Sequence, residues 1–428
     1  MSGTLLRMLP SGEVLRRCRR PVDAATLEAA GAILRDIEDR GEVAAIEHAI
    51  RLGETRAGEV ITHDARSLRA ALERLPRSER DVIERTGERV RGFARAQRGC
   101  LTDLSFQIAG GRAGHTCVPV SSAGCYAPGG RFPLPSSVLM TAIPARVAGV
   151  ARVWVASPRP SEATLAAAAV AGADGLLAIG GVQAVAALTL GLCGVPACDM
   201  IVGPGSRWVT AAKWLVSDRV GIDMLAGPSE LVVLADESAD AGLVAADLLA
   251  QAEHDADAVP ILITTSGELV TRVELELSGL LATLPTHATA RAALRNGCVA
   301  LVSGIERAID LCDAIAPEHL EIMTRDPRAV ASRISHAGAI FIGSASAEVA
   351  GDYGAGPNHT LPTGGTAKFR AGLSVFNFLR ARTWLDIEDA GAARALWDDS
   401  AVMARIEGLE GHARAAEMRM RGAELSEA

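Results

Sequence analysis

Short apolar runs alternate with helix-forming stretches along most of the chain from Val118 onward. The runs at 150–157, 175–181 and 200–205 have the length of buried strands, and an alanine-rich or amphipathic stretch follows each one. Further apolar runs of this kind lie at 230–236, 259–266, 299–304 and 338–344. The alternation is typical of βαβ units, in which helices cover both faces of a parallel sheet. Two such series predict an α/β fold with two Rossmann-like doubly wound parallel-sheet domains.

The two ends of the chain follow a different pattern. Residues 22–105 are rich in helix formers, and the stretches 25–53 and 67–98 predict amphipathic helices. The last fifty residues lose the strand pattern and are charged. We therefore expect an N-terminal helical arm at 1–21 and a C-terminal helical tail at 376–428.

The composition limits the class of protein. Only 3% of the 428 residues are aromatic although 49% are hydrophobic, so Ala, Val, Leu and Ile must form the core. The net charge of −8 argues against binding to nucleic acid or to a membrane surface, and the one basic run, Arg16–Arg20, is expected to be a solvated face. No unbroken apolar stretch is long enough to span a membrane, and no convincing signal peptide is present. Eight scattered cysteines without a CxxC pair predict a cytoplasmic protein with reduced thiols.

Two polar pairs stand out against this apolar background. The stretch AADLLAQAEHD predicts a buried helix, and Gln251 and His254 lie three residues apart, on the same face, near its end. An amide oxygen and an imidazole nitrogen at this spacing could bind a metal, or the pair could simply be a polar helix end that meets solvent. In APEHLEI, Glu318 and His319 are adjacent and could divide acid and base functions. A proline-started turn with two solvated side chains would give the same pattern.

Two further segments carry candidate chemistry. GDYGAGPNHTLPT surrounds Asp352 and His359 with glycines that allow the backbone to approach a ligand closely; an Asx-turn with a structural histidine is the alternative. Near the C-terminus, EGLEGHARAA places Glu407 and His412 on a stretch that predicts a helix. The glycine loops at 124–137, 178–183 and 202–208 could bind a nucleotide, although none is a GxGxxG or P-loop sequence.

Taken in order, AGPSELVVLAD, DLLAQAEHD, APEHLEI, GDYGAGPNHTLPT and EGLEGH resemble the zinc- and NAD-dependent histidinol dehydrogenase family. The resemblance runs from about residue 25 to His412. It implies a zinc ion (Zn2+) bound by Gln251, His254, Asp352 and His412, and Glu318 with His319 as the catalytic pair. The implied substrate-binding residues are Ser229, Gln251, His254, His319, Asp352, His359, Glu407 and His412. The implied NAD contacts are Tyr126, Gln183 and Ser206.

The resemblance also implies an activity and an assembly. The activity is the NAD-dependent four-electron oxidation of L-histidinol to L-histidine through histidinal, a step of histidine biosynthesis. His319 would act as the general base and Glu318 would activate water. Two imidazoles, one carboxylate and one amide oxygen would leave a zinc site with a net charge near +1 and with room for the substrate. The enzyme would be a homodimer in which the C-terminal tail of each subunit crosses to its partner.

The same resemblance implies a domain organisation. The N-terminal arm is residues 1–21, and residues 22–121 with 229–375 form the larger α/β domain, which carries the zinc and catalytic residues. Residues 122–228 form a smaller Rossmann-like NAD-binding domain. Residues 376–428 form the dimerisation tail.

This chain departs from the family pattern in the half expected to bind NAD. Position 206 is serine where the family usually has asparagine, and Thr189–Leu192 differ from the usual sequence after QAxAAL. Arg131 and Phe132 are also unusual, and Arg131 could be a cation for an anionic substrate group or an ordinary surface residue. Two alternatives therefore stay open. One is a related zinc and NAD dehydrogenase of another small polar alcohol, such as a sulfonated diol; the other is a zinc protein that no longer uses NAD.

Overall fold

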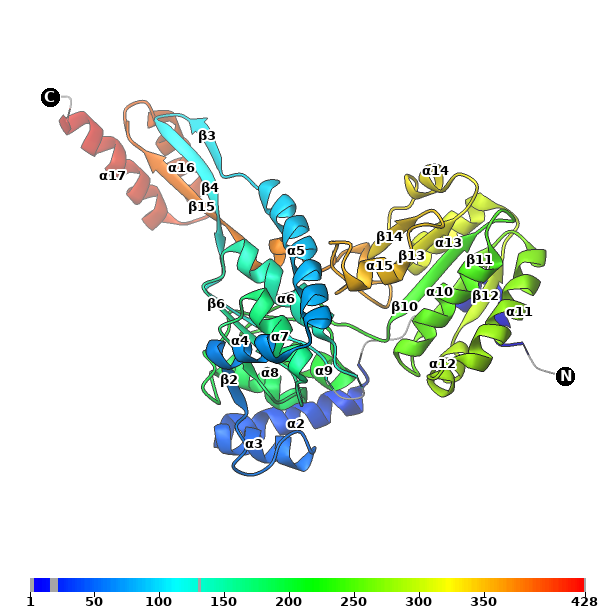
Figure 1. The fold of residues 1–428 in the computed structure, drawn as a ribbon. Coiled ribbons are helices and arrows are strands. Elements are labelled where there is room, and N and C mark those ends of the chain that lie inside the picture. The colour runs from blue at the N-terminus through cyan, green and yellow to red at the C-terminus, as the bar shows by residue number, and fades with distance from the viewer. Residues whose placement is uncertain (1–3, 16–21, 130–131, 427–428) are drawn as a thin grey trace. The chain divides into compact units, whose positions relative to one another are not determined.

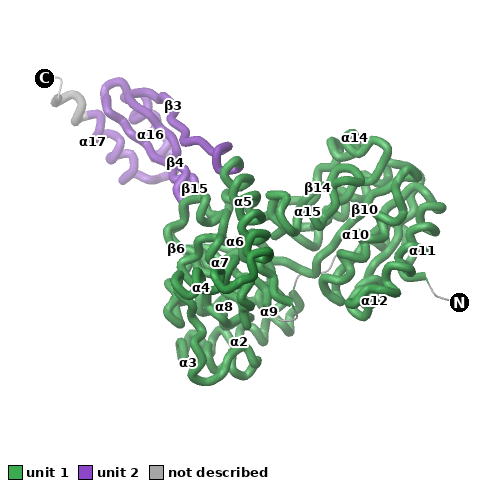
Figure 2. The backbone as a smooth tube through the Cα atoms, in the orientation of Figure 1, with its two compact units in different colours: residues 1–96, 120–378 green, residues 97–119, 379–428 purple. Residues whose placement is uncertain are grey.

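The computed structural model describes residues 4–15, 22–129 and 132–426 (Figure 1). Its contacts divide the chain into two compact units, one of residues 1–96 with 120–378 and one of residues 97–119 with 379–428 (Figure 2). Every helix in the described ranges is too short or too polar to cross a membrane. Arg16–Arg20 and Arg131, which the sequence singled out, lie outside the described residues.

The first unit contains a six-stranded sheet, called sheet A here, in which all neighbouring strands are parallel. Its order is β1 (Arg7–Met8), β12 (Cys298–Leu301), β11 (Val259–Thr264), β10 (Glu230–Ala235), β13 (His319–Met323) and β14 (Ala339–Ile342). The helices that connect or flank these strands are α1 (Ser11–Leu15), α10 (Ala241–His254), α11 (Gly267–Thr283), α12 (His287–Leu294), α13 (Ile305–Ile315), α14 (Pro327–Ala331) and α15 (Glu348–Tyr353).

The central strands of sheet A are buried on both faces, which explains the nearly continuous apolar runs in β10 and β11. Alternate residues of a strand point to opposite faces. Leu231 and Val233 of β10 pack in one apolar cluster with α10, α11 and α12, whereas Val232 and Leu234 pack in another with α13. A strand that is buried on both sides is apolar at most positions. The buried parallel strands predicted in this part of the sequence are therefore confirmed.

A second six-stranded sheet, called sheet B, also belongs to the first unit. Its order is β2 (Thr62–Asp64), β7 (Gly175–Leu177), β6 (Arg152–Ala156), β5 (Ser122–Tyr126), β8 (Met200–Val202) and β9 (Gly221–Ile222), with β2 antiparallel to β7 and the other neighbours parallel. Its connecting helices are α6 (Pro135–Ala148), α7 (Glu162–Ala171), α8 (Gly181–Leu190) and α9 (Arg207–Leu215). The alanine-rich stretch that follows the run at 150–157 forms α7, with Ser161 capping its start and Gly172 its end.

The parallel strands of the two sheets share one topology. In each sheet the first strand of the series is central, the second and third lie on one side of it, and the fourth and fifth lie on the other. This 3-2-1-4-5 order matches five of the six strands of the Rossmann order 3-2-1-4-5-6. The predicted pair of Rossmann-like parallel-sheet domains is confirmed.

The N-terminal helices pack on sheet B. They are α2 (Ala24–Arg40), α3 (Glu42–Arg51), α4 (Ala65–Arg74) and α5 (Arg77–Gly99). Helix α2 contacts α8 and α9, and α4 contacts α7. The sequence analysis grouped residues 22–121 with the strands of sheet A, so the observed packing differs from that grouping. The domain division itself stays a prediction.

The second unit holds three strands, and the sequence analysis missed all of them. Strands β3 (Leu104–Ile108), β4 (Gly111–Pro119) and β15 (Leu379–Ile387) form an antiparallel sheet in the order β15-β4-β3. The expectation that the last fifty residues contain no strand was therefore wrong. Most residues of β3 and β15 are exposed, so these strands show neither a buried run nor a clear alternation of apolar and polar positions.

The predicted tail helices are present, but as two elements. They are α16 (Arg394–Ile406) and α17 (Glu410–Ser426). Glu407 is the C-cap residue that follows the first helix, and His412 lies in the first turn of the second, with Gly408 at a φ of 77° between them. The prediction of one helix through both residues was wrong, because the left-handed glycine ends the first helix. Two 3-10 turns, η1 (Thr366–Lys368) and η2 (Val375–Phe378), complete the described elements of the first unit.

Candidate active site

Helix α10 delivers two of the predicted metal ligands. Asp240 caps its first turn by accepting hydrogen bonds from the backbone of Gly242 and Leu243, and its apolar face packs in the core of sheet A. At the other end, the side chain of Gln251 is fully buried, whereas His254, the last helical residue, is partly exposed. The predicted helix that ends at this polar pair is confirmed.

The predicted catalytic pair lies where β13 begins. The Glu318 carboxylate accepts hydrogen bonds from the Ser229 hydroxyl at 2.7 Å and from the Glu230 backbone N–H at 2.9 Å. The next residue, His319, is the first residue of the strand, and its Nδ1 donates to the Glu230 carbonyl at 3.3 Å. Its other ring nitrogen, Nε2, is buried and has no hydrogen-bond partner among the described residues.

Asp352 and His359 come from α15 and from the loop that follows it. The Asp352 carboxylate lies 3.6 Å from His254 Nε2, and its backbone carbonyl accepts a hydrogen bond from His359 Nδ1 at 3.1 Å. His359 Nε2 lies 3.4 Å from the hydroxyl of Ser137 on α6. The glycine-rich segment thus supplies Asp352 and His359 to the site. It also connects the proposed metal ligands to helix α6 beside sheet B.

Six of the predicted residues line one cavity of about 220 Å³. They are Ser229, His254, Glu318, His319, Asp352 and His359. The opposite wall includes Pro128, Ser137, Pro204 and Gly205, which follow or flank the strands of sheet B. The cavity therefore lies between the two sheets of the first unit. Residues as far apart in sequence as Ser137 and His359 meet there.

The cavity lies at opposite ends of the two sheets. Tyr126 ends β5 and Ser206 follows β8, so these residues lie at the carboxyl ends of sheet B, as expected for a doubly wound fold. Ser229 precedes β10 and His319 begins β13, so the catalytic residues lie at the amino ends of sheet A. In sheet A the site residues therefore precede or begin their strands, unlike the ligand contacts of an ordinary doubly wound sheet. The return helix α10, which carries His254, runs back from the carboxyl end of β10 to the amino ends.

Burial shifts the pKa values of Glu318 and His319 in opposite directions. It raises the pKa of the Glu318 carboxyl well above its usual value, against the opposing effect of the hydrogen bonds from Ser229 and Glu230. Burial also lowers the pKa of His319 to about 4, and the charge of Asp352 opposes this shift only in part. The imidazole is therefore neutral near pH 7 and can accept a proton at Nε2.

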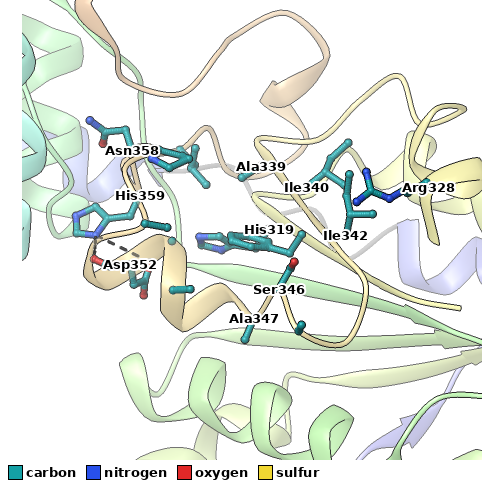
Figure 3. Close-up of a pocket in the computed structure, with 17 residues that line it drawn as sticks. His319, Arg328, Ala339, Ile340, Ile342, Ser346, Ala347, Asp352, Asn358 and His359 are labelled. Atoms are coloured by element: carbon teal, nitrogen blue, oxygen red, sulfur yellow. Dashed lines mark hydrogen bonds and ion pairs between the residues drawn. The ribbon is translucent and has the colours of Figure 1, made fainter. Parts of the chain in front are cut away.

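A second cavity, of about 470 Å³, adjoins the same residues. Figure 3 shows His319, Asp352 and His359 on its wall, and Arg328 at the end opposite His359. The remaining wall is largely apolar and includes Ile340 and Ile342 of the edge strand β14. His319 thus separates a polar cavity between the sheets from an apolar one along β14.

Comparison with known proteins places the chain in a family. The family model described as histidinol dehydrogenase matches residues 17–420. The chain belongs to the histidinol dehydrogenase family. It is 47% identical over 356 residues to the histidinol dehydrogenase of Thermus thermophilus, covering 83% of this chain and 85% of that one. Its identity to the protein of that name from Ralstonia nicotianae is 41% over 408 residues, covering 93% and 92%.

A solved structure agrees with the sequence relatives. The crystal structure of histidinol dehydrogenase from Elizabethkingia anophelis matches with a TM-score of 0.91 and 30% identity, covering 99% of this chain and all of that one. The family resemblance read from the ordered motifs is therefore confirmed, and the chain is an oxidoreductase.

The side chains of the first unit fit a divalent metal ion. Both polar atoms of the Gln251 side chain are buried without a hydrogen-bond partner among the described residues, which is costly unless a ligand binds them. Ligand atoms of His254, Glu348 and Asp352 lie within 4.8 Å of one another. An amide, an imidazole and carboxylates are suitable ligands for zinc. His412 and Glu407 lie in the second unit, are exposed, and keep their assignments as predictions.

The predicted NAD contacts lie together on sheet B, but they differ in accessibility. Gln183 is fully buried, and its Nε2 donates to Glu54 at 2.8 Å. The Tyr126 hydroxyl accepts a hydrogen bond from the Gly181 backbone at 3.3 Å. Ser206 is exposed at the start of α9 and makes no side-chain capping bond there. Of the three, Ser206 is the residue that a ligand can reach without a rearrangement.

Sequence analysis missed a group of buried carboxyl groups beside the site. Glu348 lies one helical turn before Asp352, Glu321 lies two residues after His319 on the same strand face, and Asp247 lies one turn before Gln251. Each of the three therefore shares a face with a predicted site residue. That spacing is the signal that could have identified them, because an acidic residue on the apolar face of a buried element needs a reason to be there.

Proposed function

We propose that this chain oxidises L-histidinol to L-histidine through histidinal, with reduction of two NAD, as a step of histidine biosynthesis. One observation carries the proposal. A neutral His319 with a free Nε2 and a buried Glu318 lie in the same cavity as the His254 and Asp352 side chains. This arrangement places a base (His319), a carboxyl group (Glu318) and two possible metal ligands around a space for a small molecule.

In this proposal Gln251, His254 and Asp352 hold a zinc ion together with His412 of the tail. A zinc ion held there would help to fix the substrate and would polarise its hydroxyl group. Ser229, His319, Asp352 and His359 would surround the substrate on the core side, and Glu407 would pair with its ammonium group. The residues from the tail would come from the partner subunit.

In the first oxidation, His319 Nε2 accepts the hydroxyl proton while the carbon gives up a hydride to NAD, and an aldehyde results. The low pKa of His319 favours this role, since the ring is unprotonated before the reaction. Its Nδ1–H is directed at the Glu230 carbonyl, which leaves the lone pair on Nε2.

In the second oxidation, Glu318 accepts a proton from a water molecule that adds to the aldehyde. The hydrate then loses its hydride to a second NAD and becomes the carboxylate. A carboxylate with a raised pKa is a stronger base than an ordinary one, which suits this step. The hydrogen bonds from Ser229 and Glu230 fix the orientation of Glu318.

The second unit supports the proposal of a homodimer. It exposes many large apolar side chains, among them Phe106, Leu385, Val402, Ile406 and Met418. The buried core of its two helices consists of four alanines, with Trp397 packed against them. A unit with so small a core and so much exposed apolar surface is expected to be covered by another chain.

A turnover assay tests the function. Purified protein with added zinc and NAD should form NADH on addition of L-histidinol, with two NADH for each substrate consumed. Formation of NADH from another small alcohol, but none from L-histidinol, would identify a related dehydrogenase. Bound zinc without turnover of any alcohol would indicate a zinc protein that has lost NAD use.

A further inference from the structure

We infer that Glu348 is a positioning residue for His319, holding the imidazole so that Nε2 faces the substrate as the base. The inference rests on the proposed function and names a residue that the predicted catalytic and metal sets do not contain. Glu348 Oε1 lies 3.4 Å from His319 Nδ1, on the side of the ring away from the unpartnered Nε2. The Glu230 carbonyl lies 3.3 Å from the same nitrogen.

The surroundings of Glu348 leave its carboxyl few other functions. The side chain is only 5% exposed, and neither of its oxygens makes a hydrogen bond among the described residues. Burying a carboxyl without such bonds is costly, so its retention calls for a function. Its other ionisable neighbours are the carboxyl groups of Glu318, Glu321 and Asp247. Its ligand atom also lies within 4.8 Å of those of His254 and Asp352, which belong to the proposed metal site.

The backbone fixes Glu348 relative to the histidine. Its N–H, at the start of α15, donates to Glu321 Oε1 at 2.7 Å. Glu321 is two residues after His319 on β13, so both side chains project from the same face of that strand. The start of α15 is thereby tied to the strand that carries the base. One turn later, the same helix presents Asp352.

This geometry has two consequences for the base. An acceptor at Nδ1 keeps the proton of the neutral ring there and leaves the lone pair on Nε2. Once Nε2 takes a proton, the ring becomes a cation that faces Glu348, with Glu318 Oε2 at 3.7 Å from Nδ1. Its charged neighbours are Asp352, which favours the cation, and His254 and His359, which oppose it when protonated. Burial and the neighbouring carboxyl groups raise the pKa of Glu348 well above its usual value, so Glu348 acts on the ring as an acceptor and not as a fixed charge.

The test compares Glu348→Leu with Glu348→Gln in the full-length, zinc-loaded enzyme. Leucine removes the acceptor at similar volume, and glutamine keeps an oxygen acceptor. We expect kcat for histidinol to fall about 10–100-fold in Glu348→Leu and less in Glu348→Gln. KM and zinc content should stay near the wild-type values. The thermal unfolding midpoint should stay equal or rise, because a buried carboxyl without hydrogen bonds is removed.

A control and a spectroscopic readout complete the design. Glu253→Gln removes a carboxyl beside His254 that is bonded to Thr286, so it should leave kcat unchanged. Imidazole nitrogen NMR of the resting enzyme should show the His319 proton on Nδ1 in the wild type and a shift toward Nε2 in Glu348→Leu.

Three outcomes would overturn the inference. They are an unchanged kcat in Glu348→Leu, an unchanged tautomer, and a loss of zinc, which would make Glu348 a metal ligand. The tautomer and the zinc content are read without turnover. A wild-type protein that fails to oxidise histidinol would therefore count against the proposed function and leave this test intact.

Discussion

His319 and Glu318 illustrate how burial gives adjacent residues different tasks. Both side chains lose contact with water, and burial disfavours the charged form of each. For the imidazole this lowers the pKa to about 4, and for the carboxyl it raises the pKa well above the usual value. The two groups therefore become a neutral base and a strengthened carboxylate base within one dipeptide.

The division of labour between these residues can be tested with Glu318→Gln. We expect the oxidation of histidinal to slow by about 10²–10⁴-fold, because the water-activating base is lost. The oxidation of histidinol to histidinal should slow much less, since His319 remains. Separate single-turnover assays that start from the alcohol and from the aldehyde measure the two steps. Equal slowing of both would contradict the assigned role.

The buried pair of Glu321 and Asp247 predicts a pH-dependent stability. Burial and the charge of Asp247 raise the pKa of Glu321 from its usual 4.5 to about 8. Between these values the folded protein binds more protons than the unfolded chain, so the free energy of unfolding falls as the pH rises through that window. The slope from one group is at most about 1.4 kcal/mol per pH unit.

Glu321→Gln should remove this dependence. Urea unfolding at pH 6 and pH 8 should show the wild type losing stability with rising pH, and the variant losing less. Glu306→Gln is a suitable control, because that carboxyl is exposed and its pKa is lowered by Arg333, so it stays ionised in this range. An identical pH dependence in wild type and Glu321→Gln would be evidence against the raised pKa.

The sequence could identify single site residues only where the chemistry is visible in the residue type. The clusters around His254, Glu318 and Asp352 were recognisable as polar groups in apolar or glycine-rich surroundings, and the structure places them at one cavity. Glu348 gave only a weak signal, its position one helical turn before Asp352, because a glutamate at a helix start also has an ordinary capping explanation. Its significance depends on a contact with β13, and no local pattern contains that contact.

At the level of elements, a buried ion pair holds the loop that follows β8. Lys213 of α9 donates to the Gly203 carbonyl and pairs with Asp223, and Asp223 in turn accepts the Gly203 N–H at 2.7 Å. Gly203 has a φ of 115°, and a Cβ there would meet the Tyr126 carbonyl. This network positions the turn that leads to Ser206, a proposed NAD contact.

Lys213→Met should destabilise the protein by about 3–5 kcal/mol, because it leaves the buried Asp223 charge unpaired. Removal of the exposed partner in the Arg333–Glu306 pair, by Arg333→Met, should cost less than about 1 kcal/mol. Denaturant unfolding of the two variants makes the comparison. Similar losses would mean that the buried pair is not the main support of this loop.

Elements were predictable in proportion to their burial. Most central strands of sheets A and B could be predicted because burial on both faces makes them nearly continuous apolar runs. The short edge strands β1, β2 and β9 were missed, because they are more exposed. Strands β3 and β15 could not, because their side chains are mostly exposed and their pairing is with distant β4. Register of that kind is set by tertiary contacts, which override local propensity.

At the level of the whole molecule, the proposed exchange of tails leads to a complementation test. His254→Ala and His412→Ala should each be inactive alone. When they are co-expressed or refolded together, half of the dimers are mixed. In each mixed dimer one site combines His254 of one chain with His412 of the other, so that site has all its proposed ligands. We expect recovery of about a quarter of wild-type activity.

The controls for this experiment use two core variants. His254→Ala mixed with Asp352→Ala should stay inactive, because each chain lacks one of the two metal ligands that its own first unit must supply. Failure of the His254 and His412 variants to recover activity, with mixed dimers demonstrated, would mean that each site is built from a single chain. The sequence alone could suggest this exchange only through the family resemblance, since no residue pattern reveals which copy a tail serves.

The cavity is bordered by the carboxyl ends of sheet B and by the amino ends of sheet A. This arrangement bears on how substrate and cofactor can exchange during two successive oxidations. The residues proposed to bind the organic substrate, such as Ser229 and His359, lie on the sheet A side of the cavity. The residues proposed to bind the dinucleotide belong to sheet B and its helices. Spent cofactor can consequently depart from one wall and be replaced there while the reactive intermediate stays anchored to the other. A protein with this layout needs no second compartment in which to shelter an aldehyde between its two hydride losses.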